Sequence, residues 1–261
     1  MTLDRLYKLV EHYSSKHYSG KTLTPELFTD VLVRESVELF GIVFRDIKTV
    51  MEQKQKSLNE AVSLIGGIEP FIKYKEGATV NGVGKLSLEE DYYYHDIFYL
   101  KLNSLYRPVE VVTEKDAQLL KTNMISRSLW ENPIGVIDSK ISVMFTPKQE
   151  SLCNYSYLKL PAVPYYDYCI DLSNNTQVYM PVGSSIVVSP DTGNDLQDSG
   201  GGVIRYNVEH LSDPDIPYNS QTIELEWKDT EIIVILKNIL INEGISLKDT
   251  ELFQMVKADE K

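Results

Sequence analysis

The four histidines are the first residues to consider as metal ligands or proton carriers. His12 and His17 are five residues apart, so a helix through both does not place their imidazoles on one face, as metal ligands require. His95 lies in a tyrosine-rich strand and His210 in a proline-containing loop, and neither has a cysteine or another histidine close by at ligand spacing. The histidines therefore predict no metal site.

Two glycine-containing segments resemble ligand-binding loops but lack essential positions. Asp191, Asp195 and Asp198 are spaced loosely like the ligands of a calcium loop. Such a loop has glycine at its sixth position and a closing glutamate, whereas here the sixth position is Leu196 and no glutamate follows. Residues 82–85 (GVGK) resemble a phosphate loop without its Walker spacing or the Ser/Thr after the lysine. We expect neither a metal nor a cofactor.

Catalytic side chains are equally sparse. The consecutive carboxylates Glu89, Glu90 and Asp91 point different ways in a strand or turn, so they do not form an acid and base pair. No serine or cysteine lies in a recognisable nucleophile elbow. The 17 tyrosines could stack on sugars or bases, but in a β-rich protein they more often fill cores and interfaces. The residues predict a protein that is not an enzyme.

Composition limits the classes further. The 261 residues are enough for one large domain or two small ones. With 26 basic and 38 acidic residues the net charge is −12, which argues against a protein that grips nucleic acid through its phosphates. Two cysteines indicate no disulfide framework and favour a reducing compartment. We expect no signal peptide and no membrane span, and hence a protein of the cell interior or of a particle assembled there.

Two helices are predicted at the N-terminal end. Apolar residues from Leu3 onward follow helical spacing, and Thr24 is a good N-cap for a second helix that has Pro25 at its first position. This second helix carries an apolar seam with the heptad spacing of helix packing. The seam either packs on the chain's own helices or is shared with neighbouring copies. Its residues are Val33, Val37, Phe40, Phe44, Ile47 and Met51.

The C-terminal end is organised around another helix, with Asp229 as its predicted N-cap and Gly244 closing it. This helix is apolar around most of its circumference, so one contact face does not suffice. We expect it to be buried in the chain's own core or against another subunit. The residues assigned to that packing are Ile232, Ile235, Ile239 and Leu240. A second short helix is predicted over residues 246–256.

Between the helical ends, many short strand-like segments are separated by Pro, Gly or Asn. A short helix is predicted over Glu114–Met124, and the last strand over Thr222–Trp227. The predicted fold is α+β: helical N- and C-terminal segments packed together, with an inserted antiparallel β-sandwich or open barrel. The expected segments are 1–65 (helices), 66–228 (β-rich) and 229–261 (helices), forming one cooperative unit.

The order of several short motifs resembles a family of virion proteins from crAss-like and related tailed phages of Bacteroidetes. The acidic loop after Pro190 has no counterpart in the shared pattern. The matching residues are Leu6-Tyr7, Gly20 before Pro25 and Phe28, Glu69-Pro70-Phe71, Gly84 with Leu88 and Asp91-Tyr92-Tyr93, Arg107-Pro108-Val109-Glu110-Val111, Asn132-Pro133-Ile134, residues 157–164 (YLKLPAVP), Glu224-Leu225-Glu226-Trp227, the Ile-rich helix, Gly244-Ile245, and Leu252-Phe253-Gln254.

The resemblance implies a structural protein that closes into a ring of about twelve copies in the phage neck or tail, linking portal to tail. Its partners would be copies of itself and the portal or neighbouring ring and tail proteins, in a virion assembled in the bacterial cytoplasm. DNA would pass through without specific binding, which suits a negative charge that repels phosphate. We assign the loop with Asp191, Asp195 and Asp198 to the channel lumen, with the outer face as the competing location.

Two other classes stay open. A tail-associated carbohydrate- or receptor-binding β module would use exposed tyrosines or the tryptophans Trp130 and Trp227 on a concave face. A virion hydrolase would need a nucleophile or carboxylate pair, and none stands out. Native mass separates a ring from both, because a ring is many times heavier than one chain.

Overall fold

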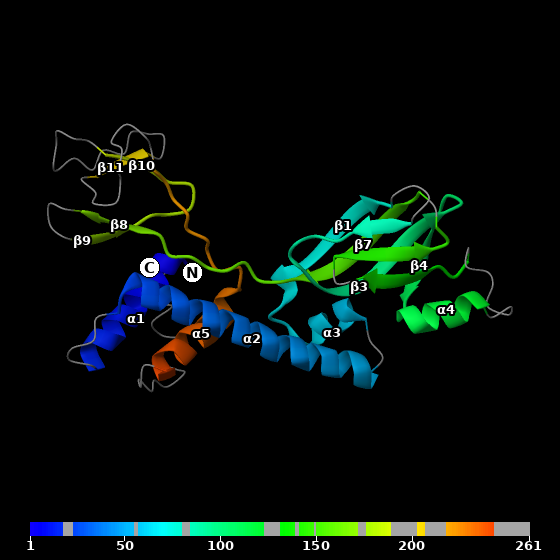
Figure 1. Ribbon diagram of the computed structural model, residues 1–261. Helices are drawn as coiled ribbons and strands as arrows, with labels where there is room; N and C mark the ends of the chain where they lie inside the picture. Colours follow the sequence, from blue (N-terminus) through cyan, green and yellow to red (C-terminus); the bar gives the residue numbers. More distant parts are fainter. Residues whose placement is uncertain are drawn as a thin grey trace. The chain divides into compact units, whose positions relative to one another are not determined.

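The computed structural model describes residues 1–17, 23–54, 57–79, 84–122, 131–138, 141–148, 150–171, 176–188, 203–206 and 218–242. Within these ranges five α-helices and three sheets form an α+β fold, which confirms the predicted class (Figure 1). The chain divides into two compact units, which we call the first unit (Met1–Ile42 with Ala162–Lys261) and the second unit (Val43–Pro161).

The first unit combines helices with two small sheets. In one sheet β8 pairs antiparallel with β9, and in the other β10 lies between a parallel β11 and an antiparallel β12. Its elements are α1 (Leu3–His17), the start of α2 (Pro25–Lys54), β8 (Tyr168–Asp171), β9 (Thr176–Tyr179), β10 (Ser185–Val188), β11 (Val203–Tyr206), β12 (Tyr218–Asn219) and α5 (Asp229–Asn242).

Local signals explain where these helices start. The Thr24 hydroxyl accepts a hydrogen bond from the Leu27 N–H at 3.3 Å, so the predicted N-cap of α2 is confirmed. The cap of α5 is one residue earlier than predicted, because the Lys228 carbonyl accepts from the N–H groups of Glu231 and Ile232. Asp229 is therefore the first helical residue, where its charge still favours the positive end of the helix dipole.

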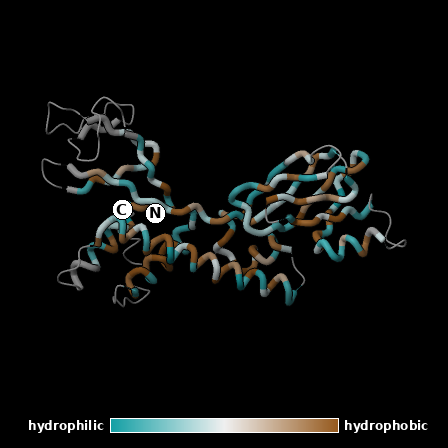
Figure 2. Tube along the Cα trace, in the orientation of Figure 1, coloured by the Kyte–Doolittle hydropathy of each residue, from teal (hydrophilic) through white to brown (hydrophobic). Residues whose placement is uncertain are grey.

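The core of the first unit lies among α1, α2 and α5. Hydrophobic residues run along α5 (Figure 2), which packs on α1. Phe40 of α2 meets Trp227 edge to face at 6.5 Å, and the Trp227 indole donates to Ser36 Oγ at 2.8 Å. The segment predicted as a strand over Thr222–Trp227 makes only one bridge, between Ile223 and Tyr165.

The second unit is a mixed seven-stranded sheet in the order β1-β7-β3-β4-β5-β6-β2, together with the last part of α2, the helices α3 and α4, and a short 3-10 helix. The predicted all-antiparallel sheet is corrected at β4 and β5, which are parallel because the chain between them crosses over through α4. The elements are α3 (Leu58–Ile65), the 3-10 helix η1 (Glu69–Phe71), β1 (Ile72–Ala78), β2 (Lys85–Ser87), β3 (Tyr92–Leu102), β4 (Leu105–Val111), α4 (Glu114–Thr122), β5 (Ile134–Asp138), β6 (Ser142–Thr146) and β7 (Leu152–Lys159).

This sheet curls into an open barrel, as the strand pattern predicts. Its two edge strands, β1 and β2, lie close together. A Cβ added to Gly77 of β1 would be only 2.7 Å from Leu86 Cδ1 of β2. Phe98 stacks on Tyr155 at 5.4 Å and meets Phe145 at 5.9 Å inside the barrel. The buried core residues are Leu86, Tyr92, Phe98, Leu100, Leu102, Val109, Val143, Phe145, Cys153, Tyr155 and Tyr157.

The two units group the chain differently from the predicted segments 1–65, 66–228 and 229–261. Strands β8 to β12 belong with α1 and α5, and the second unit ends at Pro161. That the segments unfold as one cooperative unit stays a prediction.

Candidate functional site

Helix α5 has two apolar faces. One face is fully packed within the chain: Ile232, Ile235, Ile239 and Leu240 are each 1% exposed or less. On the other side Val234 and Ile241 are 42% and 50% exposed. They are seven residues apart, which places them on the same face two turns from each other. We call these two residues the outer stripe of α5, a surface that the described residues leave exposed.

Within one chain, only part of the predicted apolar seam of α2 is buried. Phe40 and Ile47 are buried as predicted, but Val37 is 58% exposed. Val33, Phe44 and Met51 are only partly buried. Phe44 meets the rings of Tyr93 and Tyr94 in strand β3, at 5.1 and 5.3 Å.

Buried polar residues explain which face of α2 is turned toward the core. Glu35 is 3% exposed and accepts hydrogen bonds from Asn242 Nδ2 at 2.7 Å and from Arg34 Nε at 3.1 Å. Its neighbour Ser36, 1% exposed, accepts from Trp227. A heptad pattern is read from apolar residues, so it does not identify Glu35 and Ser36 as buried positions. Because these two residues face the core, Val37 lies outside.

A cluster of tyrosines borders a pocket of about 590 Å³ in the first unit. Tyr166 lies between Tyr7 and Tyr179, at ring distances of 4.9 and 5.0 Å. The Tyr7 hydroxyl donates to the Leu23 carbonyl at 2.9 Å, and Tyr179 donates to Glu224 at 2.6 Å. Burial raises the pKa of Tyr7 to about 12, and it also raises the pKa of Tyr166 and Tyr179. These phenols stay protonated donors, so the cluster holds the fold together and supplies no base.

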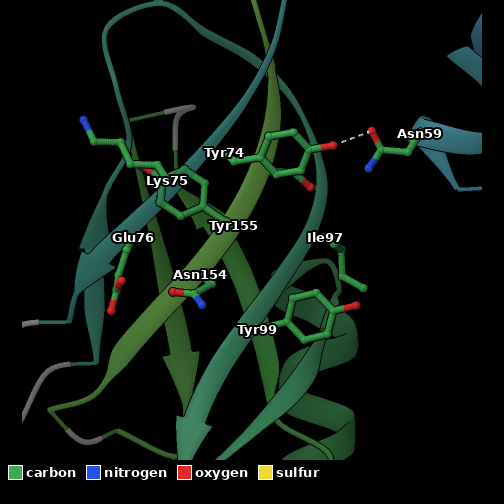
Figure 3. A pocket seen from close by; sticks show the side chains of 9 residues that line it. Asn59, Tyr74, Lys75, Glu76, Ile97, Tyr99, Asn154 and Tyr155 are labelled. Carbon is green, nitrogen blue, oxygen red and sulfur yellow. Dashed lines mark hydrogen bonds between the residues drawn. The ribbon is translucent and has the colours of Figure 1, made fainter. Parts of the chain in front are cut away.

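A second pocket, of about 570 Å³, opens on the second unit over strands β1, β7 and β3 (Figure 3). Tyr74 is 73% exposed there, and its hydroxyl donates to Asn59 Oδ1 at 3.1 Å. Asn59 Nδ2 in turn donates to Asp96 at 2.7 Å. The sequence did not single out this pocket, because only the strand register brings its residues together.

Asp96 fixes the end of this pocket. Its carboxylate accepts from the Leu58 N–H at 2.9 Å and from Ser156 Oγ at 3.0 Å, in addition to Asn59. The start of α3 is thereby tied to β3 and β7. Three donors on one carboxylate make the site around Asn59 rigid.

The neighbouring carboxylates Glu89 and Asp91 have different partners. Glu89 pairs with Lys75 at 2.5 Å, while Asp91 accepts from the Tyr157 hydroxyl at 3.0 Å, so these two carboxylates have separate partners. In the described part of the chain no three His, Cys, Asp or Glu residues gather as metal ligands. No helix among the described residues is long and apolar enough to cross a membrane.

Several predicted features lie outside the described residues. These are the loop with Asp191, Asp195 and Asp198, the helix over 246–256, His210 and Trp130. The lumen assignment of that loop stays a prediction.

Both cysteines are expected to resist thiol reagents in the folded chain. Cys153 is 0% exposed in the barrel core, where burial raises the pKa of its thiol to about 12. Cys169 is 4% exposed, and its thiol lies 3.6 Å from the Val178 carbonyl. Since the thiolate is the reactive form, Ellman's reagent at pH 8 should label neither until urea unfolds the chain. Labelling of native Cys169→Ser, which keeps only Cys153, would contradict the buried position.

Comparison of the sequence with models of known protein families and with curated proteins finds no match. Function is therefore inferred from the residues and contacts described above.

Proposed function

We propose that this chain is a structural subunit that assembles with copies of itself into a closed ring in the neck or tail of a tailed phage. The observation that carries the proposal is the outer stripe of α5: two large apolar side chains stay exposed on a helix whose opposite face is already packed. In this proposal the two side chains, which share one helix face, become buried where a neighbouring copy packs on that face. The motif order shared with virion ring proteins of crAss-like phages supports the same assignment.

A ring needs two different complementary patches on each subunit, because each copy contacts one neighbour on either side. The outer stripe of α5 is one candidate patch. Helix α2 supplies another within the first unit, where Leu27 and Val37 are 47% and 58% exposed. One chain thus has exposed apolar side chains on two helices, and the proposal places the two different contacts of a closing ring there.

The charge fits a DNA channel. Each copy carries −12, so a ring would present a large negative charge that repels phosphate and lets DNA slide without being held. The partners in this proposal are further copies, and the portal or neighbouring ring and tail proteins at the ring's two ends.

Native mass spectrometry at micromolar concentration tests the assembly. We expect a species of many times 29.8 kDa, about twelve copies in one ring. The variants Val234→Asp and Ile241→Asp place a charge on the outer stripe and should yield folded monomers with a melting temperature close to that of the wild type. Val182→Asp is the matched control, since Val182 is 60% exposed on a turn of the same unit.

Two results would count against the proposal. A folded wild-type chain that is monomeric at every concentration would remove the ring. A ring that forms equally well in both α5 variants would show that the outer stripe is not its interface.

A further inference from the structure

The outward face of β1, β7 and β3 carries a small array of side chains set by strand register. Tyr74, Ser156 and Ile97 pair across the three strands in one row. Two residues along, Glu76, Asn154 and Tyr99 pair in the next row. Residues two apart in a strand share a face, so all six line the pocket shown in Figure 3. We call this set the tyrosine array.

The two aromatic rings occupy opposite corners of the tyrosine array, and the middle strand is polar. From strand spacing, the corners are separated by about 10 Å across the sheet and about 7 Å along it. Tyr74 and Tyr99 are 73% and 38% exposed, so neither side chain is buried in the barrel core. Two separated rings with polar groups between them suit a ligand that alternates apolar faces with hydroxyl groups.

From this arrangement we propose that the tyrosine array binds a neutral oligosaccharide. The apolar face of one sugar ring would stack on Tyr74 and that of another on Tyr99, as flat apolar surfaces stack on aromatic rings. This binding would belong to the second unit and does not depend on ring assembly, which we assign to the first.

Polar groups at the centre are available for hydroxyls. Asn154 Oδ1 is shielded from solvent but has no hydrogen-bond donor among the described residues. Since no protein contact fixes this oxygen, rotation of the amide can present an acceptor or a donor to a hydroxyl. The exposed Glu76 carboxylate accepts from hydroxyls, whereas Ser156 is 3% exposed and its Oγ is held by Asp96 beneath the array.

One side of the site is fixed before a ligand arrives. The Tyr74 hydroxyl is held by Asn59, whose amide is held by Asp96. A ring already fixed in position loses little side-chain freedom on binding, which favours affinity.

Charge distinguishes a neutral sugar from a nucleic acid or an acidic glycan. Bases also stack on exposed aromatic rings, but they bring phosphates. Glu76 lies in the tyrosine array, and the adjacent cation Lys75 is paired with Glu89 at 2.5 Å. A phosphate or carboxylate would therefore meet a negative surface, in a chain of net charge −12.

The test is a binding titration of the full chain by NMR, with neutral di- to tetrasaccharides of glucose, galactose, mannose and N-acetylglucosamine as probes. We expect at least one to saturate at millimolar concentration or below. Tyr74→Ala and Tyr99→Ala should each weaken it about fivefold or more. Tyr74→Phe, which keeps the ring, should weaken it less. Tyr106→Ala is the matched control, because Tyr106 is 42% exposed on β4, outside the tyrosine array.

Three outcomes would overturn the proposal. No probe binding at about 10 mM would remove neutral sugars as ligands. Equal binding by wild type, Tyr74→Ala and Tyr99→Ala would place the sugar elsewhere. Tighter binding of oligothymidine or of an acidic hyaluronan fragment than of every neutral probe would assign the surface to anions.

Discussion

Replacing Phe40 by Asp is expected to unfold the first unit. Phe40 is 3% exposed and meets Trp227 at 6.5 Å, and the indole of Trp227 is itself held by buried Ser36. An aspartate there would either bury a charge or force water into the core, at a cost of about 3–5 kcal/mol or more. Urea unfolding followed by circular dichroism at 222 nm measures the loss, as a lower midpoint or as a chain unfolded without urea.

Ile42→Asp is the matched control for this experiment. It introduces the same charge on the same helix, but Ile42 is 44% exposed and belongs to neither surface assigned to the ring, so its free energy of unfolding should change by only about 0.5 kcal/mol. If Phe40→Asp unfolds at the wild-type urea midpoint, then Phe40 is not in the core and the packing of α2 on Trp227 is wrong. A large loss in Ile42→Asp would mean instead that any charge on α2 unfolds the unit, and not the burial of Phe40.

Helix positions were predictable because their signals are local. Thr24 followed by Pro25 marks the start of α2, and the prediction of a short helix from Glu114 onward matches α4. By propensity alone, residues 231–236 (EIIVIL) could form a strand or a helix. The predicted caps and the total length of the segment favoured a helix, and these residues do lie in helix α5. Such signals lie within a few residues of the feature they specify, so one sequence contains them.

The face that a helix buries was harder to predict. The seam of α2 was assigned from apolar residues alone, but Glu35 and Ser36 are buried because Asn242 and Trp227 hydrogen-bond to them. These partners are about two hundred residues away in the sequence, and no spacing rule links them. Val37 of that seam is exposed in the single chain, and its predicted contact with a neighbouring copy stays a prediction.

Strand pairing set the other limit. A sandwich or open barrel followed from many short strands, but the parallel pair β4 and β5 depends on how the crossover through α4 returns the chain. The tyrosine array depends on register: one residue of slip in β7 would turn Asn154 and Ser156 to the other face. No pattern within one strand carries that information, so the surplus of tyrosines was evident while their grouping was not.

Truncation of Phe98 to Ala is expected to have the largest effect in the barrel. Phe98 is 0% exposed and lies against Tyr155, Phe145 and His95 at ring distances of 5.4 to 5.9 Å. Removing the ring leaves a cavity that the surrounding aromatic side chains fill only in part, and such changes cost about 3–5 kcal/mol. Tyr99→Ala is the matched control, since the next residue of β3 points outward and is 38% exposed.

Hydrogen exchange followed by mass spectrometry in native buffer measures this loss separately in each unit. In Phe98→Ala, peptides from β3 and β7 should lose protection, and in Tyr99→Ala they should not. Peptides from α5 then test the prediction that the whole chain is one cooperative unit. If it is, a loss of stability in the barrel lowers the protection of every element, α5 included. If α5 keeps its wild-type protection while the barrel loses it, the two units unfold independently, and the prediction of one cooperative unit is wrong.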